Sequence, residues 1–255
     1  MKISPTSGMP ISPLRRLSNS LYCCSPTDMH EQAAEEYGFP NSTTPAGSTA
    51  YYIVRFSPQQ LQQRQALLFA WYRELQRLTE IEERAVASAK LAWWLTEITD
   101  NFDTSRHPLI EAMQQQKINR QEHLLDMLNG IATLVQENRF SVNEARLIGG
   151  SFSQLLTLPY TEEPAALETA AQVGSFDYLV RQLAKEPVAN PAPLEEIELP
   201  KCELPPGPVT AQAVVADRLA EKIRRGQGSK ENAPLELTPI EILWHVWRKR
   251  HAMRQ

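Results

Sequence analysis

Acidic residues at two places in the chain could hold a divalent cation, since Mg²⁺ prefers oxygen ligands such as carboxylates. Glu80, Glu82 and Glu83 lie together, and Asp100 and Asp103 have a DxxD spacing. The aspartates fall in an expected loop, where surface solvation is the usual role of a charged residue. Charge runs at helix ends are also usually solvated. We therefore predict a surface role for the aspartates and keep the three glutamates as an alternative metal site.

Other reactive residues form no recognisable site. The five histidines are scattered, and Cys23, Cys24 and Cys202 lack the spacing of a zinc site or a disulfide framework. No P-loop, dinucleotide fingerprint or GxSxG motif is present. The formal net charge is -4 without a long basic run, which excludes nucleic acid as an expected partner.

Location is predicted from composition and from the first 27 residues. Three cysteines without a framework favour a reducing compartment, and no apolar run is as long as a membrane span. The first 27 residues contain three basic and no acidic residues, as a transit peptide would, but prolines interrupt any amphipathic helix there. We favour a flexible terminal segment and a cytoplasmic protein.

Apolar periodicity predicts an all-α protein, with ten glycines and 19 prolines in 255 residues. Ser57, Pro58 and Gln60 are typical of a helix start, as are Ser141 with Glu144 and Thr238 with Glu241. The expected helices begin at Ser57, Ser141 and Pro164 and span about 84–99, 121–137, 210–225 and 239–251.

A proline-rich stretch divides the chain. Seven prolines lie between Pro187 and Pro208, so this stretch cannot continue a helix and is expected to be a mobile linker outside the main core. The predicted organisation is a flexible N-terminal segment, a helical domain, the linker and a C-terminal helical segment, with boundaries 1–45, 46–186, 187–208 and 209–255.

Four collinear blocks resemble the squalene/phytoene synthase family. GSTAYY at Gly47–Tyr52 and the helix after it are similar to the start of the family's domain, and AKLAWWLTEI at Ala89–Ile98 with HPLIEAM resembles its most specific stretch. LLDMLNGIATLVQENRF at Leu124–Phe140 and AAQVGSFDYLVRQL at Ala170–Leu183 are similar to two later helices. The resemblance implies an isoprenoid-synthase-like helix bundle, shortened where the linker replaces part of the last helices.

Family members join two prenyl diphosphates with the help of magnesium ions held by two aspartate-rich motifs. The resemblance places Gln76, Arg77 and Glu80 at the first motif, so one carboxylate remains, and Arg77 adds a positive charge. Asn129 and Gln182 stand at further acidic positions. Because amides cannot replace carboxylates around magnesium, we expect no metal cofactor, and magnesium only if a rebuilt site supports catalysis.

Basic and aromatic residues at the family's positions are better preserved. Arg73, Arg139 and Arg181 fall on family arginines and could bind phosphate, although ion pairs inside the bundle would explain them too. Tyr51 could contact a ligand at a cavity mouth. We expect an apolar cavity for a prenyl chain, lined by Leu68, Trp71, Leu75, Ile131, Phe152 and Phe176.

Two functions therefore remain. One is a non-catalytic protein that binds a prenyl lipid or acts in assembly, and the other is a prenyl-diphosphate transferase of isoprenoid biosynthesis. The carboxylate losses favour the first. The last helix is amphipathic and ends in cations, so it could contact a membrane surface or a protein partner, or pack in the bundle; its residues are Ile240, Leu243, Trp244, Trp247, Arg248, Lys249, Arg250 and Arg254.

Overall fold

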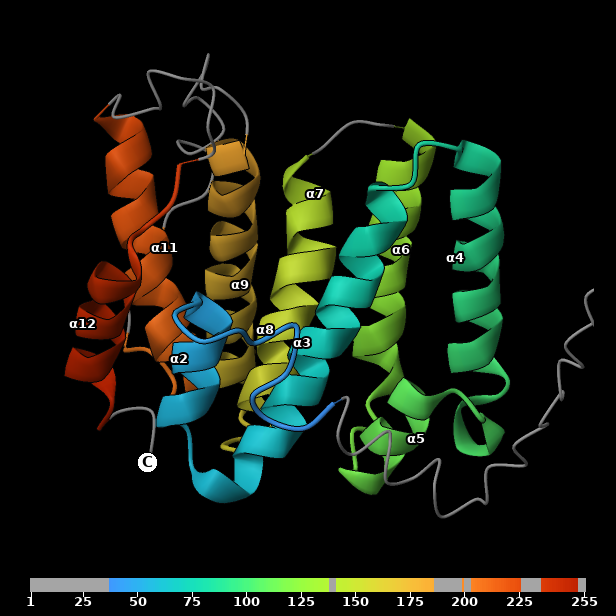
Figure 1. The fold of residues 1–255 in the computed structure, drawn as a ribbon, viewed down its shortest axis with the longest axis horizontal. Coiled ribbons are helices and arrows are strands. Elements are labelled where there is room, and N and C mark those ends of the chain that lie inside the picture. The colour runs from blue at the N-terminus through green and yellow to red at the C-terminus, as the bar shows by residue number, and fades with distance from the viewer. Residues whose placement is uncertain (1–36, 138–140, 186–198, 200–202, 226–234, 252–255) are drawn as a thin grey trace, which may run out of the picture.

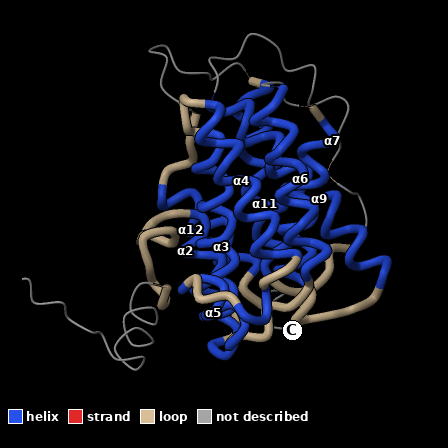
Figure 2. Tube along the Cα trace, turned by 90° about the vertical axis from the view of Figure 1, so that its right-hand side faces the viewer, coloured by secondary structure: helices blue, strands red, loops and turns tan. Residues whose placement is uncertain are grey.

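A computed structural model describes residues 37–137, 141–185, 199, 203–225 and 235–251. These residues form helices and loops without a strand, as Figure 2 shows, which confirms the all-α prediction. None of the described helices combines the length and the apolar character needed to cross a membrane. The helices are α2 (Thr49–Phe56), α3 (Gln59–Thr79), α4 (Arg84–Thr99), α5 (Pro108–Gln115), α6 (Gln121–Glu137), α7 (Val142–Ala145), α8 (Ser151–Thr157), α9 (Pro164–Lys185), α11 (Pro208–Arg224) and α12 (Pro239–Lys249), with a short 3-10 helix η1 (Phe102–Thr104) and a π-helical turn η2 (Arg146–Gly150).

Helix α3 separates two parts of the bundle. On one side it packs against α5, α6 and α4, and on the other against α8 and α2. The second part continues around a ring in which α8 contacts α9, α9 contacts α11, and α11 returns to α2. Helix α12 covers the outside of this ring against α2 and α11, at the edge of the molecule in Figure 1.

The main core fills the side of α3 that faces α4 and α6. Trp71 and Leu75 of α3 are fully buried there with Leu128 and Ile131 of α6. The ring of Trp94 from α4 meets the ring of Trp71 edge to face, with centroids 5.0 Å apart. The neighbouring Trp93 is 45% exposed, because adjacent residues on a helix point about 100° apart.

A close helix crossing fixes the wall between η2 and α9. A Cβ atom added to Gly149 would lie 2.2 Å from the backbone oxygen of Gly174, and one added to Gly174 would lie 2.0 Å from the oxygen of Gly149. Only glycine at both positions allows the two backbones to approach this closely. The crossing holds η2 and α8 against α9, which places both elements beside the cavity described below.

Several expected helix boundaries are confirmed. Helices α4, α6 and α9 begin where the sequence predicted, and the Thr238–Glu241 capping box is present at α12. The predicted cap at Ser57 is wrong, because the Ser57 hydroxyl instead donates to the carbonyl of Ile53 at the end of α2. Helices α2 and α5 were not predicted, since each has only eight residues and little room for a periodic pattern.

The prediction that the proline-rich stretch stays outside the core is wrong for the residues at its C-terminal end that the structure describes. Leu199 and Leu204 pack against a cluster formed by α9 and α11, and Pro205 is buried. Residues 186–198 and 200–202 lie outside the described part. The helices after this stretch complete the bundle instead of lying apart from it: α11 packs along α9 and buries Val209, Ala213 and Ala216.

Candidate functional site

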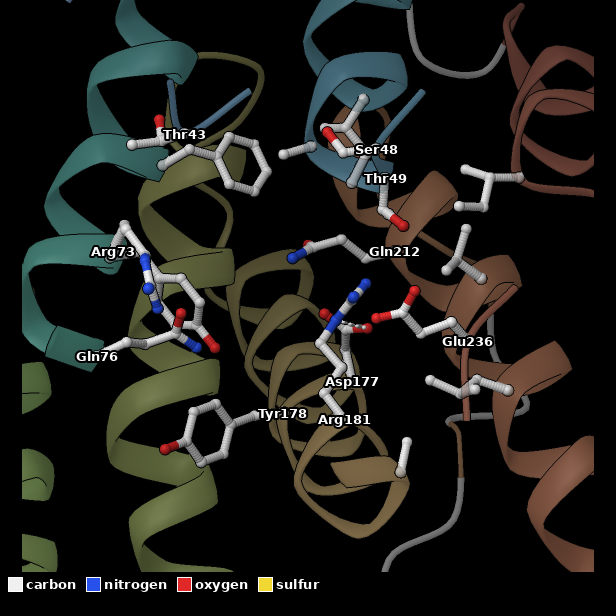
Figure 3. Close-up of a pocket in the computed structure, with 18 of the residues that line it drawn as sticks. Thr43, Ser48, Thr49, Arg73, Gln76, Asp177, Tyr178, Arg181, Gln212 and Glu236 are labelled. Carbon is white, nitrogen blue, oxygen red and sulfur yellow. Dashed lines mark hydrogen bonds and ion pairs between the residues drawn. The ribbon is translucent and has the colours of Figure 1, made fainter. Parts of the chain in front are cut away.

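A cavity of about 630 Å³ lies inside the helix ring (Figure 3). Its walls come from α2, α3, η2 with α8, α9 and α11, and residues 235–242 close one side. Arg73 and Gln76 project into it from α3, and Gln212 of α11 and Glu236 face them from the other side. The cavity therefore joins residues that are more than 160 positions apart in the chain.

One face of α3 supplies a polar wall. Arg73, Gln76, Arg77 and Glu80 line the cavity, and their spacing of three or four residues puts them on the same side of the helix. The guanidinium of Arg73 binds the carboxylate of Glu80 at two points, with Nη1–Oε1 at 2.6 Å and Nη2–Oε2 at 3.2 Å. All four residues were named from the sequence, and the structure places them along one wall of the cavity.

Helix α9 provides the facing polar wall. The Nε atom of Arg181 donates to Oδ1 of Asp177 across one helical turn, at 2.9 Å. Burial acts to lower the pKa of Arg181, but the charge and hydrogen bond of Asp177 outweigh it, so that this pKa stands above its ordinary value. The guanidinium is cationic throughout the physiological range.

Lys185 lies at the end of the same wall in a cationic environment. Burial lowers the pKa of Lys185, and the charges of Arg73 and Arg181 lower it further, against an opposing effect of Glu80. Lys185 thus lies near two guanidinium groups and one carboxylate. An anionic group entering the cavity would relieve that repulsion.

Two tyrosines line the cavity between the polar walls. Tyr72 and Tyr178 meet edge to face with centroids 6.3 Å apart, and Tyr72 stacks on Phe152 at 4.6 Å. Burial raises the pKa of both phenols, and the charge of Asp177 adds to the effect on Tyr72. Both hydroxyls are therefore protonated donors near neutral pH.

The rest of the lining is largely apolar. It contains side chains from five separate elements and from the segment before α12, which are Ile53, Phe69, Phe152, Val215, Leu219, Leu235, Leu237 and Ile242. Short polar side chains from residues 42–49 and the amide of Gln212 interrupt this surface. The Gln212 amide oxygen already accepts from the hydroxyl of Ser153 at 3.0 Å.

The carboxylates of the cavity do not fit the magnesium site of the enzymes that this sequence resembles. Glu80, Asp177 and Glu236 line it, and the first two are each bound by a guanidinium. Magnesium needs several oxygen ligands in a near-octahedral shell. Within the part of the chain that the structure describes, no three histidine, cysteine or acidic side chains are placed to hold a metal ion together. Glu82 and Glu83 are exposed and line no part of the cavity.

Other residues predicted for the site lie elsewhere. Tyr51 is outside the cavity lining and stacks on Phe39 with centroids 5.5 Å apart. Asn129 is exposed on α6, and Gln182 lies beside the hydroxyl of Tyr178 instead of lining the cavity. Arg139 lies outside the described residues.

The predicted apolar lining was largely wrong. Phe152 lines the cavity, but Leu68, Trp71, Leu75, Ile131 and Phe176 do not and belong to the main core. The sequence shows that these residues are apolar and periodic, but it does not show which side of α3 is packed solid. Much of the apolar surface of the cavity comes instead from α11 and residues 235–242, where no block of the resemblance lies.

Sequence reasoning also missed polar residues of the site. Asp177 could have been found, since its spacing to Arg181 is that of an ion pair on one helix. Gln212 and Glu236 could not, because the segment after the prolines gave no sign of returning to the bundle.

Comparison with known proteins gives one match. Residues 43–149 match the family model described as squalene/phytoene synthase. This range contains α2 to α7 and ends within η2, so it covers the polar wall of α3 but not that of α9. Searches of curated proteins and of solved structures gave no match.

Proposed function

We propose that this chain, which belongs to the squalene/phytoene synthase family through residues 43–149, binds a prenyl-type lipid in its cavity without magnesium and without transferring the prenyl group. The observation that carries the proposal is the pairing of both wall carboxylates, Glu80 and Asp177, with arginines. The polar wall thus offers cations to a ligand, where the family's chemistry would need carboxylates for a metal.

The size and lining of the cavity support an amphipathic ligand. Small-molecule sites commonly have volumes of about 300–1,000 Å³, with apolar walls and a few placed polar groups, and this cavity of about 630 Å³ lies within that range. Each buried methylene of a bound chain would contribute about 0.8 kcal/mol. Phe69, Phe152 and Val215 offer apolar surface for such a chain.

The charged residues of the cavity support only a modest contribution of an anionic head group to the binding affinity. Arg73, Arg77, Arg181 and Lys185 line the cavity against three carboxylates, which leaves an excess of one positive charge. Guanidinium groups bind phosphate at two points, but Arg73 and Arg181 must first give up part of their carboxylate contacts. We therefore expect a phosphorylated head group to add little affinity over an alcohol.

The competing function is prenyl transfer. Ionisation of an allylic diphosphate leaves a highly charged group that metal ions normally neutralise. Four cationic side chains could stabilise some of this charge, but the three arginines among them are each paired with a carboxylate. The cationic side chains of the cavity therefore support binding of a prenyl diphosphate over its ionisation.

Calorimetry with two ligands tests the proposal. Farnesol and farnesyl diphosphate are titrated into the full chain, each with magnesium and with a chelator. The proposal predicts affinities within about tenfold of each other, corresponding to 1.4 kcal/mol, and no effect of the chelator. Strong magnesium-dependent preference for the diphosphate would support the transferase, and failure of both ligands to bind would leave only an assembly role.

A further inference from the structure

Helix α12 carries a face of exposed apolar side chains. Among the described residues six large apolar side chains are exposed, and Ile240, Leu243, Trp244 and Trp247 of α12 are four of them. Since a helix turns by about 100° per residue, these four residues share one narrow arc, which we call the α12 face. The opposite side of the helix, with Ile242 and Val246, is buried against the bundle.

Cations border this face. Arg248 and Arg250 lie on either side of the arc by helical spacing, whereas Lys249 is exposed on the opposite side of the helix. The Cζ atom of Arg250 lies 4.0 Å from the centroid of the Trp247 ring, and that of Arg248 lies 6.0 Å from the Trp244 ring. These contacts hold the cations next to the aromatic surface.

The acidic residue of α12 does not offset these cations at the face. Glu241 is bound by the ammonium of Lys222 at 3.0 Å and also caps the helix at Thr238. Its negative charge is therefore neutralised by Lys222 and by the start of the helix. The α12 face presents apolar surface with positive charge at its rim and no acidic side chain of its own helix.

We propose that the α12 face binds the surface of an anionic lipid bilayer. Tryptophan prefers the interfacial layer, where its ring is apolar and its N–H remains near water. Amphipathic helices with cations beside an apolar face lie in the plane of that layer. A negative lipid surface complements the rim of Arg248 and Arg250, whereas a neutral apolar partner would leave these two charges without a counterpart.

The same helix forms part of the cavity wall. Pro239 and Ile242 line the cavity from the first turns of α12, and Leu237 lines it just before the helix. Docking through the α12 face thus brings the cavity next to the bilayer surface. Exchange of a lipid between bilayer and cavity rests on the proposed function, but the docking itself does not.

Co-sedimentation of the full chain with lipid vesicles tests the docking. We expect the protein to sediment with vesicles of phosphatidylcholine and phosphatidylglycerol, to bind less at high salt, and to bind weakly to phosphatidylcholine alone. The Trp244→Ser/Trp247→Ser variant should lose about tenfold or more in partitioning, because its apolar area is no longer buried. Trp93→Ser is the matched control, since Trp93 is similarly exposed on the distant helix α4.

A second pair of variants tests whether the cations next to the α12 face, rather than exposed cations in general, contribute to vesicle binding. Arg248→Gln/Arg250→Gln should weaken binding to the anionic vesicles by about fivefold per residue. The control Arg84→Gln/Lys90→Gln removes two exposed cations from α4 and should bind as the unmodified chain does. Equal losses in the α4 variants would overturn the proposal, and so would equal binding to neutral and anionic vesicles.

Absence of binding to any vesicle would also overturn the docking and would leave a protein partner as the occupant of the face. The calorimetric titrations in solution do not depend on this outcome. A chain that binds farnesol but no vesicle would disprove the docking alone, and one that binds vesicles but no prenyl ligand would disprove the proposed function alone.

Discussion

Arg73 and Glu80 lie two turns apart on α3 and form a two-point ion pair at 2.6 and 3.2 Å. Glu80 is the acidic residue that remains at the first metal-motif position of the resemblance, and its partner is an arginine at a neighbouring family position. The pair satisfies the carboxylate without a metal and restrains a cation that could otherwise meet a ligand.

Removal of this carboxylate should strengthen binding of an anionic ligand. The Glu80→Gln variant releases Arg73, so we expect the affinity for farnesyl diphosphate to rise about two- to fivefold, a size typical of exposed ion pairs. The affinity for farnesol should stay the same. Glu168→Gln is the control, because Glu168 pairs with Arg146 at 3.3 Å and lines no part of the cavity. Lower diphosphate affinity in Glu80→Gln would indicate that Glu80 binds a metal with the ligand.

A larger side chain at Val215 should fill the cavity at little cost in stability. Val215→Phe would occupy space meant for the prenyl chain and lower the affinity for farnesol about tenfold or more, the equivalent of two buried methylenes. Val180→Phe is the control, since Val180 is fully buried on α9 without lining the cavity. Overpacking there should cost about 1–3 kcal/mol of unfolding free energy. Unchanged farnesol binding in a folded Val215→Phe protein would place the ligand elsewhere.

The glycine crossing between η2 and α9 should be sensitive to one methyl group. Gly149→Ala would put its Cβ 2.2 Å from a backbone oxygen, which cannot move independently of α9. We expect a loss of about 3 kcal/mol in urea unfolding, at the upper end of overpacking costs. Gly130→Ala is the comparison, because its Cβ meets a side-chain atom of Ile148, at 2.6 Å, instead of a backbone atom. Equal losses in the two variants would show that the backbone contact is not what makes Gly149 necessary.

The helix cap at Glu241 should make stability depend on acid pH. Hydrogen bonds from the Thr238 backbone and the Lys222 side chain lower the pKa of Glu241 from its ordinary value of 4.5 to about 2. A lowered pKa in the folded state means that the ionised group stabilises the fold above pH 4.5 and that this contribution is lost as the pH falls toward 2.

Glu241→Gln should therefore destabilise the protein at pH 7 and lose that effect in acid. The expected cost at pH 7 is about 1 kcal/mol, the usual value of a lost cap, since the side chain is 39% exposed and the full shift would overstate it. Urea unfolding of the variant and the unmodified chain at pH 7 and near pH 3 measures the difference. A cost that does not change with pH would assign the effect to helix propensity instead of charge.

The sequence predicted the helices better than the cavity, and the reason is physical. Apolar periodicity and the capping residues of α12 are local signals, so the bounds of α4 and α6 and the start of α9 were confirmed. Five residues named from the resemblance line one cavity, because they lie on the facing sides of α3 and α9: Arg73, Gln76, Arg77, Glu80 and Arg181. Neither the periodicity nor the resemblance tells which apolar side chains pack in the main core and which line the cavity.

The missing part of the site came from long-range packing. The proline-rich stretch suggested that the C-terminal helices stand apart, but α11 closes the helix ring and brings Gln212 and Val215 to the cavity. Tyr51 illustrates the same limit at close range. It lies on α2 next to the cavity, but its ring turns toward Phe39 instead, a choice that depends on residues beyond its own helix.

The most direct test of the central claim follows the diphosphate itself. Phosphorus magnetic resonance can monitor farnesyl and geranylgeranyl diphosphate in the presence of magnesium and an excess of the full chain. We predict signals that shift or broaden on binding, return unchanged after the protein is removed, and behave in the same way with a chelator. Release of pyrophosphate that requires magnesium would contradict the account and identify a prenyl transferase.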